Sequence, residues 1–477
     1  MPKSRPTSPK KTSKHHQPAS AKHRTKHHIA GNVANPITPP PPENIQPIDT
    51  AGPQFAEPSP TPDPTRFVVK HGSDKEAYSI LDKEKGTLKP RPFPISPDVE
   101  PRMSLADAIG SKGQQVMSAI EKAGQIVFHS IGDTGNTSSA EDMNMVTDKL
   151  VSDFNETEPE NVPSFCYNLG DVVYSFGEAK YYYDQFYDPY RDYPAPIFAV
   201  PGNHDGMVAP GVTNPTLQAF LENFCTAGQP FHRTPEAGGL ARTAGVQPGV
   251  YFTLEADPFV RILGLYSNCL EDPGMISTQS DSEQTYPYLT DAQTNFLVAG
   301  LKRVRADRFA GAVIIAVHHP PYVAQVKADA RATFGKHGGS PLMNAEIDKA
   351  CQTAGAWPHA VLSGHAHNYQ RFTRRLGNRE TPYIVAGNGG HAHKQLTNKG
   401  MLALRTPADQ PSLSNGQDTV VFENYDDQGF GYLRIIVDAK QLRIEYHPAS
   451  DGPGAKTPDD FVTVELATHK LVHFQVN

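Results

Sequence analysis

Five short apolar segments, each ending in a cluster of small polar residues, constrain the fold of this chain more than any other feature. They are QIVFHSIGD (125–133), SFCYNLGD (164–171), PIFAVPGNHD (196–205), GAVIIAVHHPP (311–321) and HAVLSGHAHNY (359–369). Their length and composition indicate buried strands that end in loops. Amphipathic segments between them indicate helices, the clearest at 104–124, with Ser104 as predicted N-cap, and at 290–306, with Thr290 as N-cap.

Alternating strands and helices predict an α/β fold. In open α/β sheets, ligands bind beyond the carboxyl ends of the strands, so five polar clusters at five such ends predict one shared site. After Tyr383 the segments YIVAGNGG, GYLRIIVDA and QLRIEYHPA have the composition of strands, and we expect them to form an antiparallel end region.

The first 65 residues differ from the rest of the chain. They hold 15 of the 44 prolines, and residues 1–40 carry eight Lys/Arg and no acid. Such a segment buries too little apolar surface to offset its ordering entropy, so we predict a disordered, basic, Pro-rich tail at 1–65. Residues 66–101 are again proline-broken, and we expect an irregular extension laid over one main domain at 102–477.

Charge and hydropathy restrict the partners. Residues 41–477 hold 36 Lys/Arg against 51 Asp/Glu, and this acidic balance argues against nucleic acid as a partner of the body. We expect no membrane span, because no apolar run reaches 18 residues. No Sec-type signal is visible, which makes a cytoplasmic location the default expectation. The four cysteines lack CxxC spacing, so a thiolate zinc site is not expected.

The strand ends carry side chains that bind metals. The candidate ligands, in chain order, are Asp133, Asp171, Tyr174, Asn203, His318, His365 and His367. Carboxylate, amide and imidazole donors together favour Zn, Fe or Mn over Mg or Ca. Seven donors are too many for one tetrahedral ion, but they suit two ions that share a bridging carboxylate.

In order, GDTG (132–135), GDVVY (170–174), GNHD (202–205), the His318 of AVHHPP and GHAH (364–367) resemble the five motifs of the calcineurin-like metallophosphoesterases. A glycine in the first motif and a tyrosine in the second are similar to the purple acid phosphatase branch. The resemblance covers about 125–388. It implies a two-sheet β-sandwich flanked by α-helices, with residues 102–477 as the catalytic domain.

The same resemblance implies roles for individual residues. Asp133, Tyr174 and His367 would bind the first metal, Asp171 would bridge, and Asn203, His318 and His365 would bind the second. His204 would act on the substrate or leaving group. His319 stays open: it would be a ligand in place of His318, or a catalytic or supporting donor beside it.

Gly135 stands where many relatives carry a metal-binding histidine, and Tyr174 is the residue expected to replace it. Because a free phenol has a pKa of about 10, a phenolate ligand needs a strongly acidic ion, which predicts Fe(III) at this position. Zn, Fe or Mn(II) would suit the second position. An incidental packing tyrosine is the alternative.

The implied function is a dinuclear metal-dependent phosphatase that hydrolyses phosphate monoesters of small molecules by a metal-bound hydroxide, an acid phosphatase. Alternatives are a phosphodiesterase of the same superfamily and a non-catalytic scaffold. Members of this branch are often secreted, which conflicts with the cytoplasmic default.

His129 lies within its strand and is expected in the core. The glycine-rich AGNGGH (386–391) lacks the GK[ST] of a P-loop and is expected to shape the mouth of the site.

Overall fold

The computed structural model describes residues 66–71, 92–209, 211–225, 235–237, 244–267, 274–277, 289–324, 337–396 and 418–474. The tail predicted at 1–65 lies outside the described residues. The described parts of the 66–101 extension contact the main domain. The backbone N–H groups of Val68 and Val69 donate to the Asp184 carboxylate, and Phe93 packs edge-on against Tyr266 at 5.2 Å between ring centroids.

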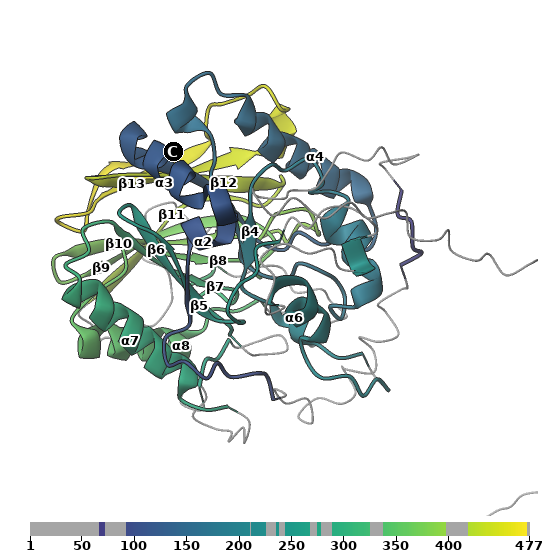
Figure 1. Cartoon of the computed structure of the whole chain (residues 1–477), viewed down its shortest axis with the longest axis horizontal. Helices are drawn as coiled ribbons and strands as arrows, with labels where there is room; N and C mark the ends of the chain where they lie inside the picture. The colour runs from purple at the N-terminus through teal and green to yellow at the C-terminus, as the bar shows by residue number, and fades with distance from the viewer. Residues whose placement is uncertain are drawn as a thin grey trace, which may run out of the picture. The chain divides into compact units, whose positions relative to one another are not determined.

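The described strands form two sheets that face each other (Figure 1). One sheet has the strand order β1 (Arg102–Ser104), β5 (Phe252–Ala256), β6 (Val260–Leu265), β7 (Ala312–Val317), β8 (Ala360–Ser363), β10 (Arg379–Ala386), β9 (Tyr369–Leu376) and β11 (Asp418–Asp426). The other has the order β15 (Lys470–Phe474), β14 (Asp460–Glu465), β13 (Gln441–Pro448), β12 (Gly431–Asp438), β2 (Gln125–Ile131), β3 (Cys166–Asn168) and β4 (Ile197–Ala199). This is the predicted sandwich.

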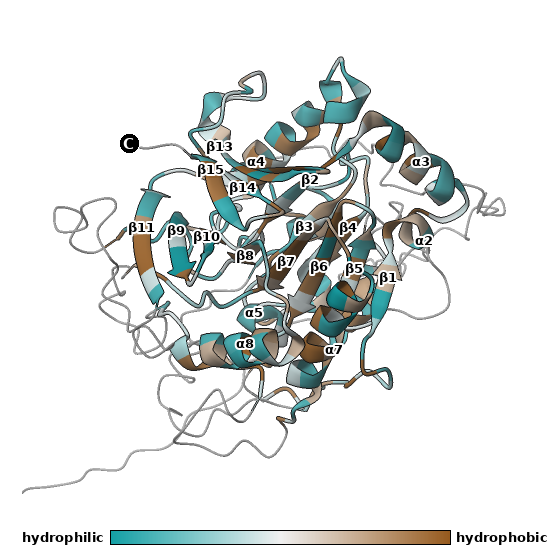
Figure 2. Cartoon of the chain, turned by 90° about the vertical axis from the view of Figure 1, so that its left-hand side faces the viewer, coloured by the Kyte–Doolittle hydropathy of each residue, from teal (hydrophilic) through white to brown (hydrophobic). Residues whose placement is uncertain are grey.

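Helices flank the sheets. They are α2 (Leu105–Ile109), α3 (Gly113–Ala123), α4 (Ala140–Ser152), α5 (Asn203–Gly206), α6 (Gln218–Phe224), α7 (Ala292–Ala306) and α8 (Pro341–Ala354). Single turns occur at Gly110–Lys112, Asp153–Asn155, Pro159–Asn161, Ala179–Tyr181, Tyr183–Tyr187, Pro235–Ala237 and Ala449–Asp451. In Figures 1 and 2, α7 and α8 lie together along the sheet that contains β5 to β8, and α4 lies against the other sheet.

The central strands are apolar along their whole length because both of their faces are covered. In β7, Ile314 belongs to the apolar cluster between the sheets, which also contains Phe128 of β2. Its neighbour Ile315 points to the other face and belongs to the cluster that contains Phe296 of α7. Figure 2 shows these inner strands as the most hydrophobic part of the fold. The sandwich therefore holds the strand ends rigidly.

One local prediction is confirmed and three need correction. Ser104 caps α2 by accepting a hydrogen bond from Asp107 N, but the predicted helix is interrupted at Gly110, whose φ is +82°. The C-terminal strands form an antiparallel region only in part: β12 and β13 pair antiparallel, but β10 belongs to the other sheet. β10 pairs in parallel with β8, and β12 enters the centre of the second sheet beside β2. The N-cap of α7 is Asp291 and not the predicted Thr290, although Thr290 Oγ1 accepts a hydrogen bond from Ala292 N at 3.3 Å.

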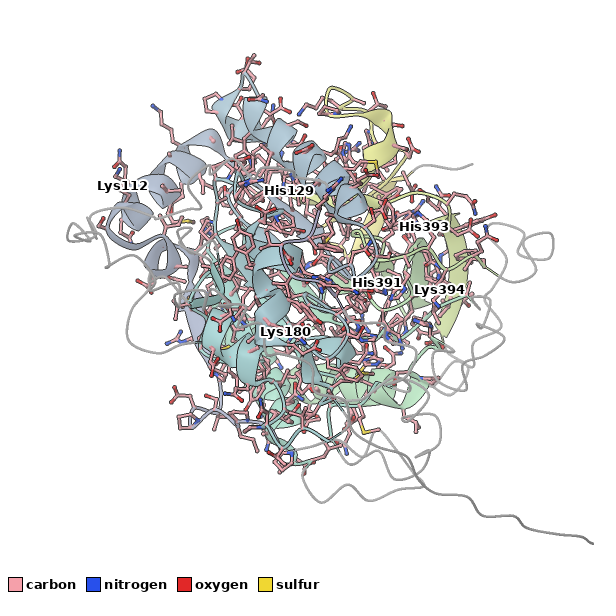
Figure 3. All side chains as sticks on the ribbon, turned by 90° about the vertical axis from the view of Figure 1, so that its right-hand side faces the viewer. Lys112, His129, Lys180, His391, His393 and Lys394 are labelled. Atoms are coloured by element: carbon pink, nitrogen blue, oxygen red, sulfur yellow. The ribbon has the colours of Figure 1, made fainter. Side chains whose placement is uncertain are left out.

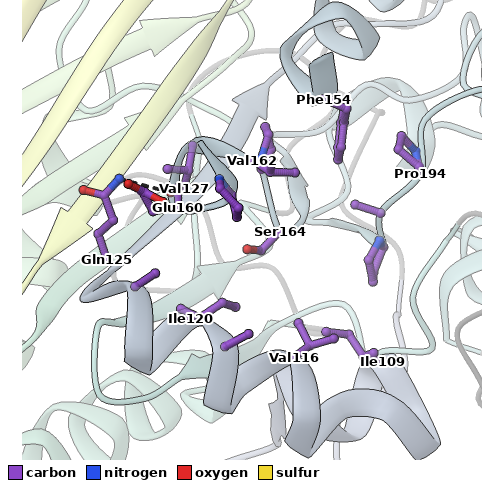
Figure 4. Close-up of a pocket in the computed structure, with 16 residues that line it drawn as sticks. Ile109, Val116, Ile120, Gln125, Val127, Phe154, Glu160, Val162, Ser164 and Pro194 are labelled. Carbon is purple, nitrogen blue, oxygen red and sulfur yellow. Dashed lines mark hydrogen bonds between the residues drawn. The ribbon is translucent and has the colours of Figure 1, made fainter. Parts of the chain in front are cut away.

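An apolar groove of about 550 Å³ lies at the amino end of β2, at the opposite end of that strand from the predicted ligands. Figure 4 shows Val116 and Ile120 of α3 pointing across it toward Val162. Within the described residues, no helix combines the length and apolarity needed to cross a membrane.

Candidate metal centre

The seven predicted ligands follow the carboxyl ends of five strands. β2, β3 and β4 run parallel to one another in one sheet, and β7 and β8 run parallel in the other. Four of these residues have left-handed backbone conformations: Asp133, Asp171, His365 and His367, with φ values of 56°, 55°, 72° and 52°. Residues with side chains rarely adopt this region, and such strain concentrates at functional sites.

Tyr174 lies at the centre of the first predicted set. Its hydroxyl oxygen is 3.1 Å from Asp133 Oδ1, 2.9 Å from Asp171 Oδ2 and 3.2 Å from His367 Nε2. The ring is fully buried. Ligand atoms of Asp133, Asp171 and His367 all lie within 4.8 Å of one another. The tyrosine expected to complete this set therefore points its oxygen at all three of the other donors.

Asp171 also faces the second predicted set. Its Oδ2 lies 3.3 Å from His318 Nε2. The same nitrogen is 2.9 Å from Asn203 Oδ1, and this amide oxygen is 3.1 Å from His365 Nδ1. Asp171 is thus placed between the two groups, as a bridging ligand would be.

The tautomer of His318 follows from its other contact. Nδ1 lies 2.8 Å from the Leu169 carbonyl, which only accepts, so Nδ1 carries the hydrogen and Nε2 faces the site. Burial opposes protonation of His318, but the Asp171 carboxylate outweighs it and raises the pKa of His318 to about 9. The surrounding oxygens thus favour a positive charge at this point.

Burial also shapes the other ionisable groups. It raises the pKa of Asp133 well above its usual value, and Asp171 adds to the effect. For Asp171, burial acts upward, but His318 and His204 together hold its pKa below the usual value. Burial lowers the pKa values of His365 and His367, which favours the neutral, metal-binding form.

Gly135 lies beside Tyr174, the residue expected to replace the metal-binding histidine that many relatives carry at position 135. A Cβ at this position would lie 3.1 Å from Tyr174 Cδ2, 2.4 Å from Gln185 Oε1 and 2.6 Å from the Val172 carbonyl. Gln185 fixes the tyrosine backbone through two hydrogen bonds of 2.8 Å, one to its N–H and one to its carbonyl. A side chain at position 135 would therefore occupy the space that the phenol needs.

The two histidines assigned to catalysis lie in different places. His204 packs on the Tyr174 ring at 4.3 Å, and its Nδ1–H donates to the Ser175 carbonyl at 2.8 Å. His319 contacts Ser267 Oγ at 2.5 Å through Nδ1 and packs against His365 at 4.2 Å between centroids. Because His318 meets Asp171 and Asn203, the geometry favours His318 as the ligand and His319 as support for His365.

Sequence reasoning gave no individual role to three residues that adjoin the site. His337 packs against His365 at 4.7 Å and His367 at 5.0 Å, although no strand or motif marked it. The Asp205 carboxylate accepts from three backbone N–H groups in the second and third motifs; it belongs to the GNHD motif, which was the available signal. His391 stacks on Tyr174 at 3.6 Å. His129 is a core residue, as expected, bonded to Tyr193 and Asp153.

The donor chemistry fits metal ions. His318 Nε2, an Asp171 oxygen and the Asn203 amide oxygen converge, and a cation bound there would take the place of the proton that the raised pKa of His318 puts on Nε2. A cation at this point would neutralise buried carboxylates that otherwise repel one another. Oxygen and imidazole donors of this kind suit Zn, Fe or Mn.

A buried set of Asp and His donors that could hold a metal ion lies at the strand ends of a two-sheet sandwich. The family model for calcineurin-like phosphoesterases matches residues 127–369, just over half of the chain, and the chain belongs to this family.

Solved structures with similar folds include a purple acid phosphatase, PPD1, from yellow lupin seeds. It is 15% identical with a TM-score of 0.44, over 72% of this chain and 54% of the lupin chain. Another is PhoD, 13% identical with a TM-score of 0.42, over 74% of this chain and 72% of that one. The chain thus spans about half of the lupin protein. No curated protein matches in sequence.

Proposed function

We propose that this protein is a phosphatase of the purple acid phosphatase type, which hydrolyses phosphate monoesters of small molecules with two metal ions. One observation carries the proposal: the Tyr174 hydroxyl oxygen lies within 3.2 Å of donor atoms of Asp133, Asp171 and His367. A packing tyrosine would not need to direct its only polar atom at three candidate metal ligands.

The position of Tyr174 supports Fe(III) at the first site. A buried phenol gives up its proton only to a strongly acidic partner, and ferric iron meets that requirement better than divalent Zn or Mn. Asn203, His318 and His365 supply neutral donors at the second site, which suits Zn, Fe or Mn(II). The bound ions would activate water as a nucleophile and offset charge on the phosphoryl oxygens.

His204 has the geometry of a proton carrier. Its backbone N–H donates to Asp171 Oδ1 at 2.8 Å, which fixes the residue beside the shared carboxylate. Its Nδ1–H is committed to Ser175, so Nε2 is the nitrogen that can exchange a proton with a substrate or leaving group. His337 packs against the rings of His365 and His367 and is a second imidazole that adjoins the site.

The proposal is tested by elemental analysis together with the visible spectrum and a pH–activity profile on aryl phosphate monoesters and diesters. We expect about two metal equivalents including iron, a visible absorption band that Tyr174→Phe abolishes, and faster monoester hydrolysis in the acidic range.

Other outcomes would contradict parts of the proposal. A colourless enzyme active with Mn or Zn would remove Fe(III), and faster diester hydrolysis would make the protein a phosphodiesterase. A metal-replete protein that hydrolyses neither substrate would indicate a scaffold.

A further inference from the structure

The segment after β10 is tied to the loop that carries Asp133. Gly132 N donates to the Ala386 carbonyl at 2.9 Å, and Gly389 N donates back to the Gly132 carbonyl at 3.0 Å. The backbone N–H of His391 donates to the Asp133 carbonyl at 3.1 Å. Three backbone hydrogen bonds therefore tie the glycine-rich segment 386–391 to the first motif.

The side chain of His391 continues this pattern. Its Nδ1–H donates to the Gly135 carbonyl at 3.0 Å, and its ring lies flat on the Tyr174 ring, with 3.6 Å between centroids and 6° between planes. The centroids of His391 and His204 are 6.5 Å apart, farther than either is from Tyr174, so the phenol lies between the two imidazoles. Figure 3 labels His391 beside His393 and Lys394.

Gly135 joins the two contacts. Its carbonyl holds the His391 ring, and its Cα lies so close to the phenol that an added Cβ would be 3.1 Å from Tyr174 Cδ2. Gly135 therefore packs on one edge of the phenol while His391 covers one face. Rotation of the tyrosine ring about its side-chain bonds would have to disrupt both contacts.

We propose that His391 is a positioning residue that sets the plane of Tyr174 and so keeps the phenol oxygen directed at Asp133, Asp171 and His367. This inference rests on the proposed metal site. His391 acts through its stacked ring and its bond to Gly135, and it is not itself a ligand. The hydrogen bond from Nδ1–H to the Gly135 carbonyl fixes the tautomer of His391 and holds its ring in one orientation.

The test separates the ring from the hydrogen bond. His391→Phe keeps a stacking ring without the bond, His391→Asn keeps a donor without the ring, and His391→Ala loses both. The matched control is His393→Ala, two residues further along, whose ring packs on Phe430 at 3.9 Å. Zn²⁺ affinity is measured by calorimetry for each variant, in the wild-type and the Tyr174→Phe backgrounds.

We expect His391→Ala to weaken binding about 10- to 100-fold at the site whose affinity Tyr174→Phe also lowers, as for other residues that orient metal ligands. His391→Phe should retain most of the affinity, and His393→Ala all of it. In the Tyr174→Phe background, His391→Ala should cost less than about threefold, because its effect passes through the phenol. In iron-loaded protein, His391→Ala should shift or broaden the visible band.

An equal loss in both backgrounds would overturn the proposal, since His391 would then support the loop and not the tyrosine. So would unchanged affinity in His391→Ala. If the wild type binds Zn²⁺ but iron gives no band, the ferric assignment fails while the calorimetric cycle still decides the role of His391. If the wild type binds no metal, both proposals fail. Should His391→Ala not fold, the Phe and Asn variants give the comparison.

Discussion

The Asp133, Tyr174 and His367 side of the site and the Asn203, His318 and His365 side differ in how one histidine on each, His367 and His318, is held. On the second side, His318 is fixed by a hydrogen bond to the Leu169 carbonyl. On the first side, within the described residues, the buried His367 Nδ1 has no hydrogen-bond partner, and packing on His391 at 4.9 Å and His337 at 5.0 Å orients the ring instead.

This difference has a consequence for sensitivity to mutation. Donors fixed by backbone carbonyls depend on the sheet, which the whole core stabilises. Donors fixed by ring packing depend on neighbouring side chains, and they should respond to substitutions at positions that bind no metal. The first side is therefore expected to be the more easily disturbed of the two, although both share Asp171.

The largest effect is expected where the two sides meet. Asp171→Asn keeps the shape of the side chain but removes the charge that both sets share. Loss of one member of a buried charged group costs about 3–5 kcal/mol, which corresponds to ~10²- to 10⁴-fold in kcat/KM if it is expressed in the transition state. Metal content should fall at both positions. Retention of two metals and near-wild-type activity would show that Asp171 does not bridge.

The second side is tested by a pair of adjacent histidines. His318→Asn should lose one metal equivalent and about 10²-fold or more in activity, because its Nε2 faces Asp171 and Asn203. His319→Asn, which removes the contact to Ser267, should keep both metals and lose about tenfold or less. Metal analysis and kcat/KM on an aryl phosphate decide between them. The reverse order of effects would assign the ligand role to His319.

The first side is tested by adding a methyl group at position 135, beside Tyr174. Gly135→Ala adds a Cβ that would meet Gln185, the Val172 carbonyl and the phenol, an overpacking that costs about 1–3 kcal/mol. We expect weaker metal binding and an altered visible band. Gly454→Ala, where a Cβ would meet nothing within 4 Å, is the control and should match the wild type in urea unfolding. If Gly135→Ala also has the wild-type free energy of unfolding and metal affinity, Gly135 does not restrict the position of the Tyr174 ring.

The sequence predicted the fold and the convergence of the strand ends better than it predicted the surroundings of the site. Each strand carries its own apolar run and its own terminal cluster, and the rule for parallel strands then brings the clusters together. The roles of His337 and His391 depend on segments that pack together from distant parts of the chain, which no local pattern records. The pairing of β12 with β2 was missed for the same reason: composition identifies a strand but not its neighbour.

The smallest effect is on the free energy of unfolding in acid. It must be distinguished from a loss of activity at low pH in protein that is still folded. His359 lies just before β8, at the amino end of the strand whose carboxyl end carries His365 and His367. Burial, with a smaller contribution from His469, lowers the pKa of His359 to about 3. The unfolded chain, with a His pKa of about 6.5, therefore binds a proton between these values that the folded chain does not.

Stability should consequently fall as the pH drops from about 6.5 toward 3, by about 2 kcal/mol at pH 5 from this residue. His359→Gln, which cannot titrate, should be less stable at pH 7.5, because His359 accepts from Val313 N and donates to the Leu466 carbonyl. Its unfolding free energy in urea should nevertheless fall less steeply between pH 7.5 and 5. Parallel slopes for the two proteins would show that His359 does not set the acid sensitivity. Activity can also decline in acid while His359→Gln is still folded. Such a decline would be due to protonation of the metal ligands, which include His365 and His367 after the carboxyl end of β8.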